Sequence, residues 1–313
     1  MKVQAGQFKK VAVLKGGPSS ERNISLKSGA AVAIGLRAAG YEVIEVDITG
    51  RSLDLPEPVD AVFIALHGEF GEDGQIQELL EAKRIPYTGS GPKASRVSFD
   101  KRLSKEVFVK EGIPTAAYEV IGPNGHASLP LPVVIKPPCQ GSTIGIFKIS
   151  HPDEWKAALR ESLKYDGEVI VETFIPGREL TVGVVGNTAL PAVEILAPDG
   201  WYDFDAKYSK GHSRHLCPAP LDKKVADQAR DIALQTFNSL GCRGLGRVDF
   251  RLTESGELFV LELNNIPGFT ETSLLPEAAQ VAGISFPALC RQIMEMATLD
   301  SAVPPHTGGL YVV

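Results

Sequence analysis

Short apolar runs alternate with amphipathic stretches over the first 90 residues of the chain. The apolar runs predict buried strands, and stretches with apolar residues three or four apart predict helices. An alternation of strands and helices is typical of a parallel sheet. We therefore expect an α/β domain that ends near Gly91, with strands at 9–17, 41–48 and 60–68 and helices at 25–40 and 73–85.

The pattern changes after this first unit. An amphipathic stretch at 98–113 predicts a helix that begins near Ser98, a candidate N-cap. A polar, glycine-bearing loop at 139–143 then lies between two apolar runs. We expect a smaller α+β unit that ends around 176–177, with strands at 131–138, 144–149 and 168–175 and a helix at 152–165.

The third unit contains two candidate antiparallel strands, a long polar loop and a hairpin. The hairpin is predicted from two alternating runs joined by the turn TESGE. The expected elements are strands at 178–186, 189–196, 246–252 and 258–265, a loop at 199–217, and helices at 222–241, 274–283 and 286–297. The chain is thus expected to divide into 1–100, 101–178 and 179–313.

Composition narrows the class of protein. With 313 residues, of which 43% are hydrophobic, the chain is long enough for two or three domains. A net charge of -6 and the lack of a long basic run argue against a nucleic-acid partner. There is no signal-peptide pattern and no apolar run near the roughly 20 residues that span a bilayer, so we expect a cytoplasmic protein without a membrane partner. The cysteines form no CxxC pair, which argues against a zinc or disulfide framework.

The hairpin carries the first candidate chemistry. Side chains alternate along a strand, so Glu262 and Asn264 share one face, and Asp249 shares a face with Arg247 on the partner strand. Pairing across the turn brings Asp249 close to Glu262. Two carboxylates and an amide oxygen are hard ligands suited to Mg²⁺. The alternative is an arginine–glutamate pair on an exposed sheet face.

Two other segments have weaker signals. Lys136 ends an apolar strand and precedes a glycine-bearing loop, an arrangement that can neutralise and cradle phosphate. Neither the P-loop pattern GxxxxGK[ST] nor the dinucleotide pattern GxGxxG is present. Glu21 and His67 follow buried strands, where open α/β sheets bind ligands. The alternative for His67 is a hydrogen bond to the backbone of an ordinary turn.

Several motifs occur together in one order. They are GGPSSERNISLKSG, HGEFGEDGQIQ, DKRLSK, VVIKPPCQGSTIG, VETFIPGRELTV, WYDFDAKY, GRVDF and LELNNIPGFTETSLLP. Together they resemble the D-alanine–D-alanine ligases, which are ATP-grasp enzymes of peptidoglycan synthesis, over nearly the whole chain. The resemblance implies a three-domain α/β ATP-grasp fold, with ATP between the central and C-terminal domains. It also implies a homodimer.

The resemblance assigns the nucleotide and metal residues. Two Mg²⁺ ions, or Mn²⁺, are implied at Asp249, Glu262 and Asn264, and K⁺ is an expected activator. Glu172 would meet the adenine amino group and Glu179 the ribose hydroxyls. The full set expected around ATP is Lys101, Lys136, Ser142, Glu172, Phe174, Ile175, Glu179 and Lys207.

The resemblance also assigns the amino-acid residues. Glu21 would bind the ammonium group of the first D-alanine, and His67 would lie near its carboxylate. Ser142 would link Glu21 to Tyr208 as part of a lid. The oxyanion would be held by Arg247 and the N–H of Gly268, and the second carboxylate by Ser273.

The sequence leaves some alternatives open. Gln140, Glu78, Asn265 and Arg251 depart from the family pattern, which usually has Glu, a small residue, Thr or Ser, and an apolar residue there. The nearest alternative activity is ligation to D-lactate or D-serine, although Tyr208 favours D-alanine. A non-catalytic binder on the same fold is a remote alternative, because no expected ligand is missing.

Overall fold

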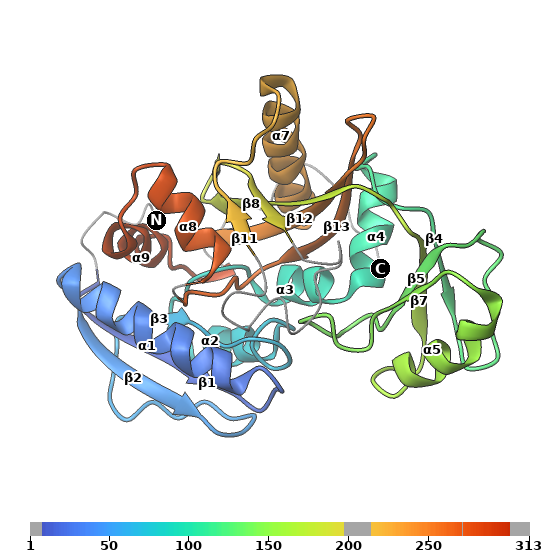
Figure 1. Cartoon of the computed structure of the whole chain (residues 1–313). Helices are drawn as coiled ribbons and strands as arrows, with labels where there is room; N and C mark the ends of the chain where they lie inside the picture. Colours follow the sequence, from blue (N-terminus) through green and yellow to red (C-terminus); the bar gives the residue numbers. More distant parts are fainter. Residues whose placement is uncertain (1–7, 197–213, 271, 301–313) are drawn as a thin grey trace.

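The computed structural model describes residues 8–196, 214–270 and 272–300. Three β-sheets lie across the described part of the molecule (Figure 1). They have three, six and four strands. No helix within the described ranges is both long and apolar enough to cross a membrane.

The three-stranded sheet is parallel, as the sequence predicts. Its strand order is β2-β1-β3, and both neighbours of β1 run parallel to it. The loops that follow β1 and β3 therefore leave the sheet at the same edge, and they carry Glu21 and His67. The elements are β1 (Lys10–Gly16), α1 (Arg22–Ala38), β2 (Glu42–Ile48), β3 (Ala61–Ile64) and α2 (Gln75–Lys83).

The four-stranded sheet is antiparallel, with strand order β4-β7-β5-β6. Residues of α5 share its apolar core, and the other face borders a cleft described below. Its strands are β4 (Tyr118–Ile121), β5 (Val133–Lys136), β6 (Phe147–Ile149) and β7 (Val169–Thr173), with η1 (Pro152–Glu154) and α5 (Trp155–Ser162) beside them.

The six-stranded sheet joins the other two parts. Helix α7 covers one face, and α8 and α9 connect the other face to α1 through a shared apolar core (Figure 1). The strand order is β11-β10-β8-β12-β13, with β9 paired to β8. The elements are β8 (Arg178–Val185), β9 (Thr188–Ala189), β10 (Val193–Leu196), β11 (Arg214–Leu216), α7 (Lys223–Ser239), β12 (Leu245–Leu252), β13 (Leu258–Asn264), α8 (Leu274–Val281) and α9 (Phe286–Glu295).

The single helix expected at 98–113 was wrong. The structure has two helices, α3 (Pro92–Phe99) and α4 (Lys101–Lys110), separated at Asp100. Asp100, and not Ser98, caps α4: its side chain accepts from the backbone N–H groups of the second and third helical residues. The Ser98 hydroxyl instead donates to Ala94 O at 2.8 Å. The break makes Lys101 the first residue of a new helix.

The strand expected at 144–149 begins only at Phe147. Ser142 and Thr143 have φ angles of 54° and 62°, in the left-handed region that an L-residue adopts at a cost. Gly145, inside the expected strand, also has a positive φ, of 71°, which an extended strand cannot include, so the loop after β5 extends further than the apolar pattern predicts. Helix α3 and strands β4 and β11 were not predicted.

Candidate active site

Two clefts open beside the six-stranded sheet. The first has an empty volume of about 760 Å³ and lies where the loops after β1 and β3 meet the segment after β13. Of the residues assigned above to the amino acids, it is lined by Glu21, His67, Ser142, Arg247, Gly268 and Ser273. The second, of about 750 Å³, lies between the four-stranded and six-stranded sheets. Of the residues assigned to nucleotide and metal, it is lined by Lys136, Glu172, Phe174, Ile175, Glu179, Asp249 and Glu262.

A smaller hollow lies between the two clefts. It shares Asn264 with the first cleft and Glu262 with the second, and Lys101 lines it as well. Lys207 and Tyr208, the remaining expected residues, lie outside the described residues. All other expected site residues line one of the two clefts or the hollow between them.

Glu21 lies in the first cleft, directly before α1. The Ser142 hydroxyl donates to Glu21 Oε1, which joins the loop after β5 to the start of α1. Backbone approaches the same carboxylate at two glycines: a Cβ on Gly68 would lie 2.9 Å from Glu21 Oε2, and one on Gly141 would lie 3.0 Å from it. The carboxylate is therefore held among segments from two different sheets.

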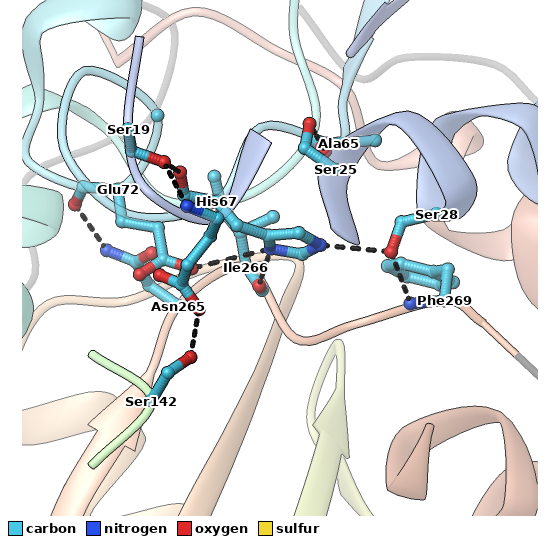
Figure 2. A network of polar contacts seen from close by, with 12 residues as sticks. Ser19, Ser25, Ser28, Ala65, His67, Glu72, Ser142, Asn265, Ile266 and Phe269 are labelled. Carbon is cyan, nitrogen blue, oxygen red and sulfur yellow. Dashed lines mark hydrogen bonds and ion pairs between the residues drawn. The ribbon is translucent and has the colours of Figure 1, made fainter. Parts of the chain in front are cut away.

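His67 is buried and bonded at both ring nitrogens (Figure 2). Nδ1 lies 3.1 Å from Ile266 O, which can only accept, so Nδ1 carries a proton. Nε2 lies 3.0 Å from the Ser28 hydroxyl oxygen, which also accepts from Phe269 N. The alternative to a ligand role for His67 was a hydrogen bond to the backbone, and the bond to Ile266 O is such a bond. The histidine also lines the first cleft, so the two interpretations are compatible.

Glu72 is a site residue that the sequence analysis did not single out. Its Oε1 lies 3.6 Å from His67 Nδ1, and it lines the first cleft. Burial opposes the charged imidazole, but the carboxylates of Glu72 and Glu21 outweigh it and raise the pKa of His67. Burial also raises the pKa of Glu72, which His67 only partly offsets. Both shifts favour the protonated form of the group concerned.

The hairpin brings Asp249 and Glu262 together as the sequence predicts, although a bulge between Asp249 and Phe250 shifts the register by one residue. Asp249 pairs with Glu262 and Arg247 with Asn264 across β12 and β13. Arg247 binds Asp249 through two bonds, Nε to Oδ1 at 2.9 Å and Nη2 to Oδ2 at 2.8 Å. Asp249 also accepts from Thr181 Oγ1 at 2.6 Å. The alternative of an arginine–glutamate pair on an exposed face is wrong, because Arg247 pairs with Asp249 and Glu262 with Lys101, and none of these side chains is exposed.

The oxygen donors on this hairpin fit a divalent cation. The described residues contain no cluster of three or more histidine, cysteine or acidic side chains suited to a metal. Mg²⁺ is commonly bound by one or two carboxylates together with water and substrate phosphates, which is what Asp249 and Glu262 offer. Asn264 donates Nδ2 to Asp249 Oδ2 at 3.0 Å here, and turning the amide end for end would present its oxygen instead.

Helix α4 carries two buried lysines that face the two sheets of the second cleft. Lys101 Nζ lies 3.2 Å from Glu262 Oε2 and donates to Gln140 O at 2.7 Å. Burial disfavours its ammonium form, but Glu262 outweighs this and raises the pKa of Lys101. Lys105, one turn later, lies 3.0 Å from Glu172 Oε1. Lys105 was not singled out, although its spacing of four from Lys101 places both on one helix face.

The segment between β7 and β8 forms the outer wall of the second cleft. Arg251, on β12, donates Nε to Ile175 O at 3.1 Å and Nη1 to Glu179 Oε2 at 3.3 Å. Its guanidinium also lies 5.7 Å from the centre of the Phe174 ring, and Lys148 Nζ lies 4.0 Å from the same centre. The departure at Arg251 thus places a cation in the cleft wall and fixes the carboxylate of Glu179.

Gly268 and Ser273 lie at the far end of the first cleft. Ser273 immediately precedes α8, and its oxygen accepts from Thr270 N at 2.8 Å. A Cβ at Gly268 would lie 2.7 Å from Ser273 Oγ, so only glycine fits without a shift. The N–H of Gly268 finds no acceptor in the part of the chain that the structure describes, which leaves a donor at the cleft.

Asn265, for which the sequence offered no physical role, is a buried tether. Its Nδ2 donates to Glu72 O at 2.9 Å and to Ser98 Oγ at 2.8 Å (Figure 2 labels Asn265 and Glu72). Asn265 directly follows the candidate metal ligand Asn264, and it therefore joins the end of β13 to the loop of His67 and to α3. Glu78, another departure, pairs on the surface with Arg96.

The sequence matches two family models. Residues 106–295 match the family described as D-ala D-ala ligase C-terminus, and residues 49–90 match that described as D-ala D-ala ligase N-terminus. The first match alone covers more than half of the chain.

Similar proteins agree with these matches. The D-alanine–D-alanine ligase of Methylacidiphilum infernorum is 46% identical over 289 residues, which is 92% of this chain and 95% of that one. The ligase of the same name from Cereibacter sphaeroides is 48% identical over 303 residues, covering 94% and 97%. The crystal structure of the D-alanine–D-alanine ligase from Bacillus anthracis has a TM-score of 0.81 at 30% identity, covers 92% and 97% of the two chains, and bears out the expected ATP-grasp fold. The chain therefore belongs to the D-alanine–D-alanine ligase family.

Proposed function

We propose that this protein joins two D-alanine molecules to D-alanyl-D-alanine with the cleavage of ATP, as a step in making peptidoglycan precursors. One observation carries the proposal: the β12–β13 hairpin borders both clefts. Asp249 and Glu262 line the second cleft. Arg247 and Asn264, each two residues away on the same strand, line the first. A phosphate in one cleft and a carboxylate in the other would meet at this hairpin.

The first cleft suits two amino acids. The Glu21 carboxylate, held by Ser142, would bind the ammonium group of the first D-alanine, and His67, whose pKa is raised, would face its carboxylate. The N–H of Gly268, which has no acceptor among the described residues, and the guanidinium of Arg247 would bind the oxyanion. Ser273, at the start of α8, would bind the carboxylate of the second D-alanine, where the helix N-terminus favours an anion.

The second cleft suits ATP. Lys101 and Lys136 would neutralise its phosphates, Glu172 would accept from the adenine amino group, and Glu179 would bind the ribose. Phe174 and Ile175 would form the wall against the base. Asp249, Glu262 and Asn264 would hold Mg²⁺ or Mn²⁺, whose charge would offset that of the phosphates and polarise the transferred group.

The reaction follows from this arrangement. A carboxylate oxygen of the first D-alanine attacks the γ-phosphorus, the bond to the β–γ bridging oxygen breaks, and ADP leaves. The neutral amine of the second D-alanine then attacks the carbonyl carbon of the acyl phosphate. Arg247 and Gly268 stabilise the tetrahedral oxyanion, and inorganic phosphate departs as the peptide bond forms. Water must be excluded, because it would hydrolyse the acyl phosphate.

The test is phosphate release with product analysis. Purified protein with ATP, Mg²⁺ and D-alanine should release phosphate and form D-alanyl-D-alanine in equal amounts. The names of the relatives favour D-alanine as second substrate. Equal or greater coupling to D-lactate or D-serine at neutral pH would support the nearest alternative instead. Absence of D-alanine-dependent release would favour a non-catalytic binder.

Replacement of Glu21 by Gln should weaken the first amino-acid site. The change removes the charge that would pair with the ammonium group, and a hydrogen bond to a charged group is worth on the order of 10- to 100-fold in affinity. We expect the D-alanine KM of the first site to rise by that factor with little change in ATP binding. Glu45→Gln, in a lysine pair on β2 outside both clefts, is the matched control. An unchanged KM would remove Glu21 from the site.

Replacement of Arg251 by Met should loosen ribose recognition. Glu179 would lose its buried cationic partner, so we expect the ATP KM to rise about tenfold and the preference for ATP over 3′-deoxy-ATP to shrink. Arg178→Met is the control, because Arg178 forms a comparable pair with Glu194 on the same sheet but lines neither cleft. The same preference in Arg251→Met as in the unaltered protein would refute the role.

We also propose that the protein acts in the cytoplasm as a homodimer and that K⁺ activates it. Family resemblance supports these proposals. Size-exclusion chromatography with light scattering, and turnover with K⁺ exchanged for Na⁺, would test the last two.

A further inference from the structure

Lys105 is a buried charge for which the proposed reaction gives no role. Its side chain lies behind the second cleft and does not line it. Nζ donates to Thr115 Oγ1 at 2.7 Å and Ala116 O at 3.3 Å, and it lies 3.0 Å from Glu172 Oε1. These three partners match the three protons of an ammonium group, so Lys105 has no donor left for a ligand.

Glu172 has two lysine partners on one oxygen. Lys136 Nζ lies 2.7 Å from the same Oε1, and Lys136, unlike Lys105, lines the cleft. Burial opposes the charge on Glu172, but the two ammonium groups outweigh it and lower the pKa of that carboxyl. Burial lowers the pKa of Lys105, and the negative charge of Glu172 offsets this effect only in part. One carboxylate thus holds two buried cations, of which one can reach a ligand.

The second oxygen of Glu172 is the one that a ligand can use. Both lysines make their closest contact to Oε1, Oε2 accepts no hydrogen bond from the described residues, and Glu172 lines the cleft. An ionised carboxylate can only accept. It therefore favours a ligand with an N–H group at this point and disfavours one with a carbonyl oxygen. Among purines, adenine has an amino group at position 6, whereas hypoxanthine and guanine have an oxygen.

A nucleotide would change the balance between the two lysines. Lys136 is expected to turn toward the phosphates, while the bonds of Lys105 to Thr115 and Ala116 hold it in place. We propose that Lys105 is a positioning residue that keeps the Glu172 carboxylate directed at the 6-amino group and so sets the preference of the second cleft for adenine over 6-oxo purines. This inference rests on the proposed function in that the cleft takes a nucleotide.

The experiment compares ADP with IDP, which differ at position 6 and its neighbouring ring nitrogen. Calorimetric titration with Mg²⁺ present measures both affinities without turnover. We expect the unaltered protein to prefer ADP, and Lys105→Met to lower the ADP:IDP affinity ratio about tenfold or more, mainly through weaker ADP binding. Glu172→Gln should lower the ratio as well, since its amide can also donate. Adding Lys105→Met to Glu172→Gln should lower it no further.

Controls separate this role from a structural one. Lys110→Met removes an exposed lysine of the same helix and should leave the ratio unchanged. A folded Lys105→Met that binds both nucleotides more weakly by one factor, with the ratio kept, overturns the inference. Lys105→Gln, which keeps a polar group in the buried site, provides the same comparison if the methionine variant does not fold.

The unaltered protein separates the two proposals. Phosphate release with ATP and D-alanine, but equal affinity for ADP and IDP, overturns the inference about Lys105 alone. Failure to bind ADP overturns the proposed function with it.

Discussion

Replacement of Glu262 by Gln is expected to lower turnover by on the order of 10³-fold or more, because a metal that neutralises transferred phosphate contributes several kcal/mol. The change removes one charge and almost no volume. Glu262 lies opposite Asp249 across the hairpin and forms an ion pair with Lys101 on α4, so it borders both the second cleft and the smaller hollow. Phosphate release under saturating ATP and D-alanine measures the effect, and circular dichroism checks the fold.

The matched control for Glu262 is Glu254→Gln. Glu254 is exposed at the turn of the same hairpin and should tolerate the change. Lys101 would lose its carboxylate partner but keep Gln140 O, so a lower melting temperature with an intact fold is expected. A folded variant with normal turnover would show that Glu262 is not a metal ligand. An unfolded variant would show that the carboxylate is needed for structure.

Replacement of Arg247 by Lys is the second large expected effect. Lysine keeps the charge but not the planar pair of donors that Arg247 directs at Asp249. Loss of a preorganised oxyanion donor lowers kcat by about 10²- to 10³-fold in other enzymes, and we expect a fall of that size here. ATP affinity should change much less, because Arg247 lines the first cleft and not the second.

Arg178→Lys is the control for this substitution. Arg178 also binds one carboxylate through Nε and Nη2, both at 2.7 Å, on the same sheet, but outside both clefts. Its variant should keep normal kcat. If Arg247→Lys kept normal kcat as well, or lost ATP affinity and kcat to the same extent, the oxyanion role would be refuted.

The local part of the site could be predicted from the sequence alone. Alternation with a period of two fixes which side chains share a face, and the short turn fixes which residues pair. These rules bring Asp249 near Glu262, but regular pairing from the turn would place Asp249 opposite Leu261. A bulge between Asp249 and Phe250 shifts the register by one residue and sets Glu262 opposite Asp249, which the pattern does not predict. The parallel first sheet follows from the alternation of strands and helices in the same way.

The long-range part could not be derived from such patterns. Glu21 and Ser142 are 121 residues apart, and His67 and Ile266 are 199 apart, so their contacts depend on how the sheets pack. Only the ordered motifs of a known family indicated that these residues meet. Glu72 and Lys105 were missed because burial, and not the local sequence, makes their charges significant. The break at Asp100 was missed because the apolar spacing continues through it.

The proposed reaction requires that a D-alanine carboxylate in the first cleft receive the γ-phosphoryl group of a nucleotide in the second. D-alanine with both carboxylate oxygens replaced by ¹⁸O tests it most directly. Transfer through an acyl phosphate moves one labelled oxygen into each inorganic phosphate released, which mass spectrometry detects, and leaves one in the new peptide bond. We expect one ¹⁸O in each phosphate, released in the same amount as the dipeptide. Unlabelled phosphate released in the presence of labelled D-alanine would contradict it.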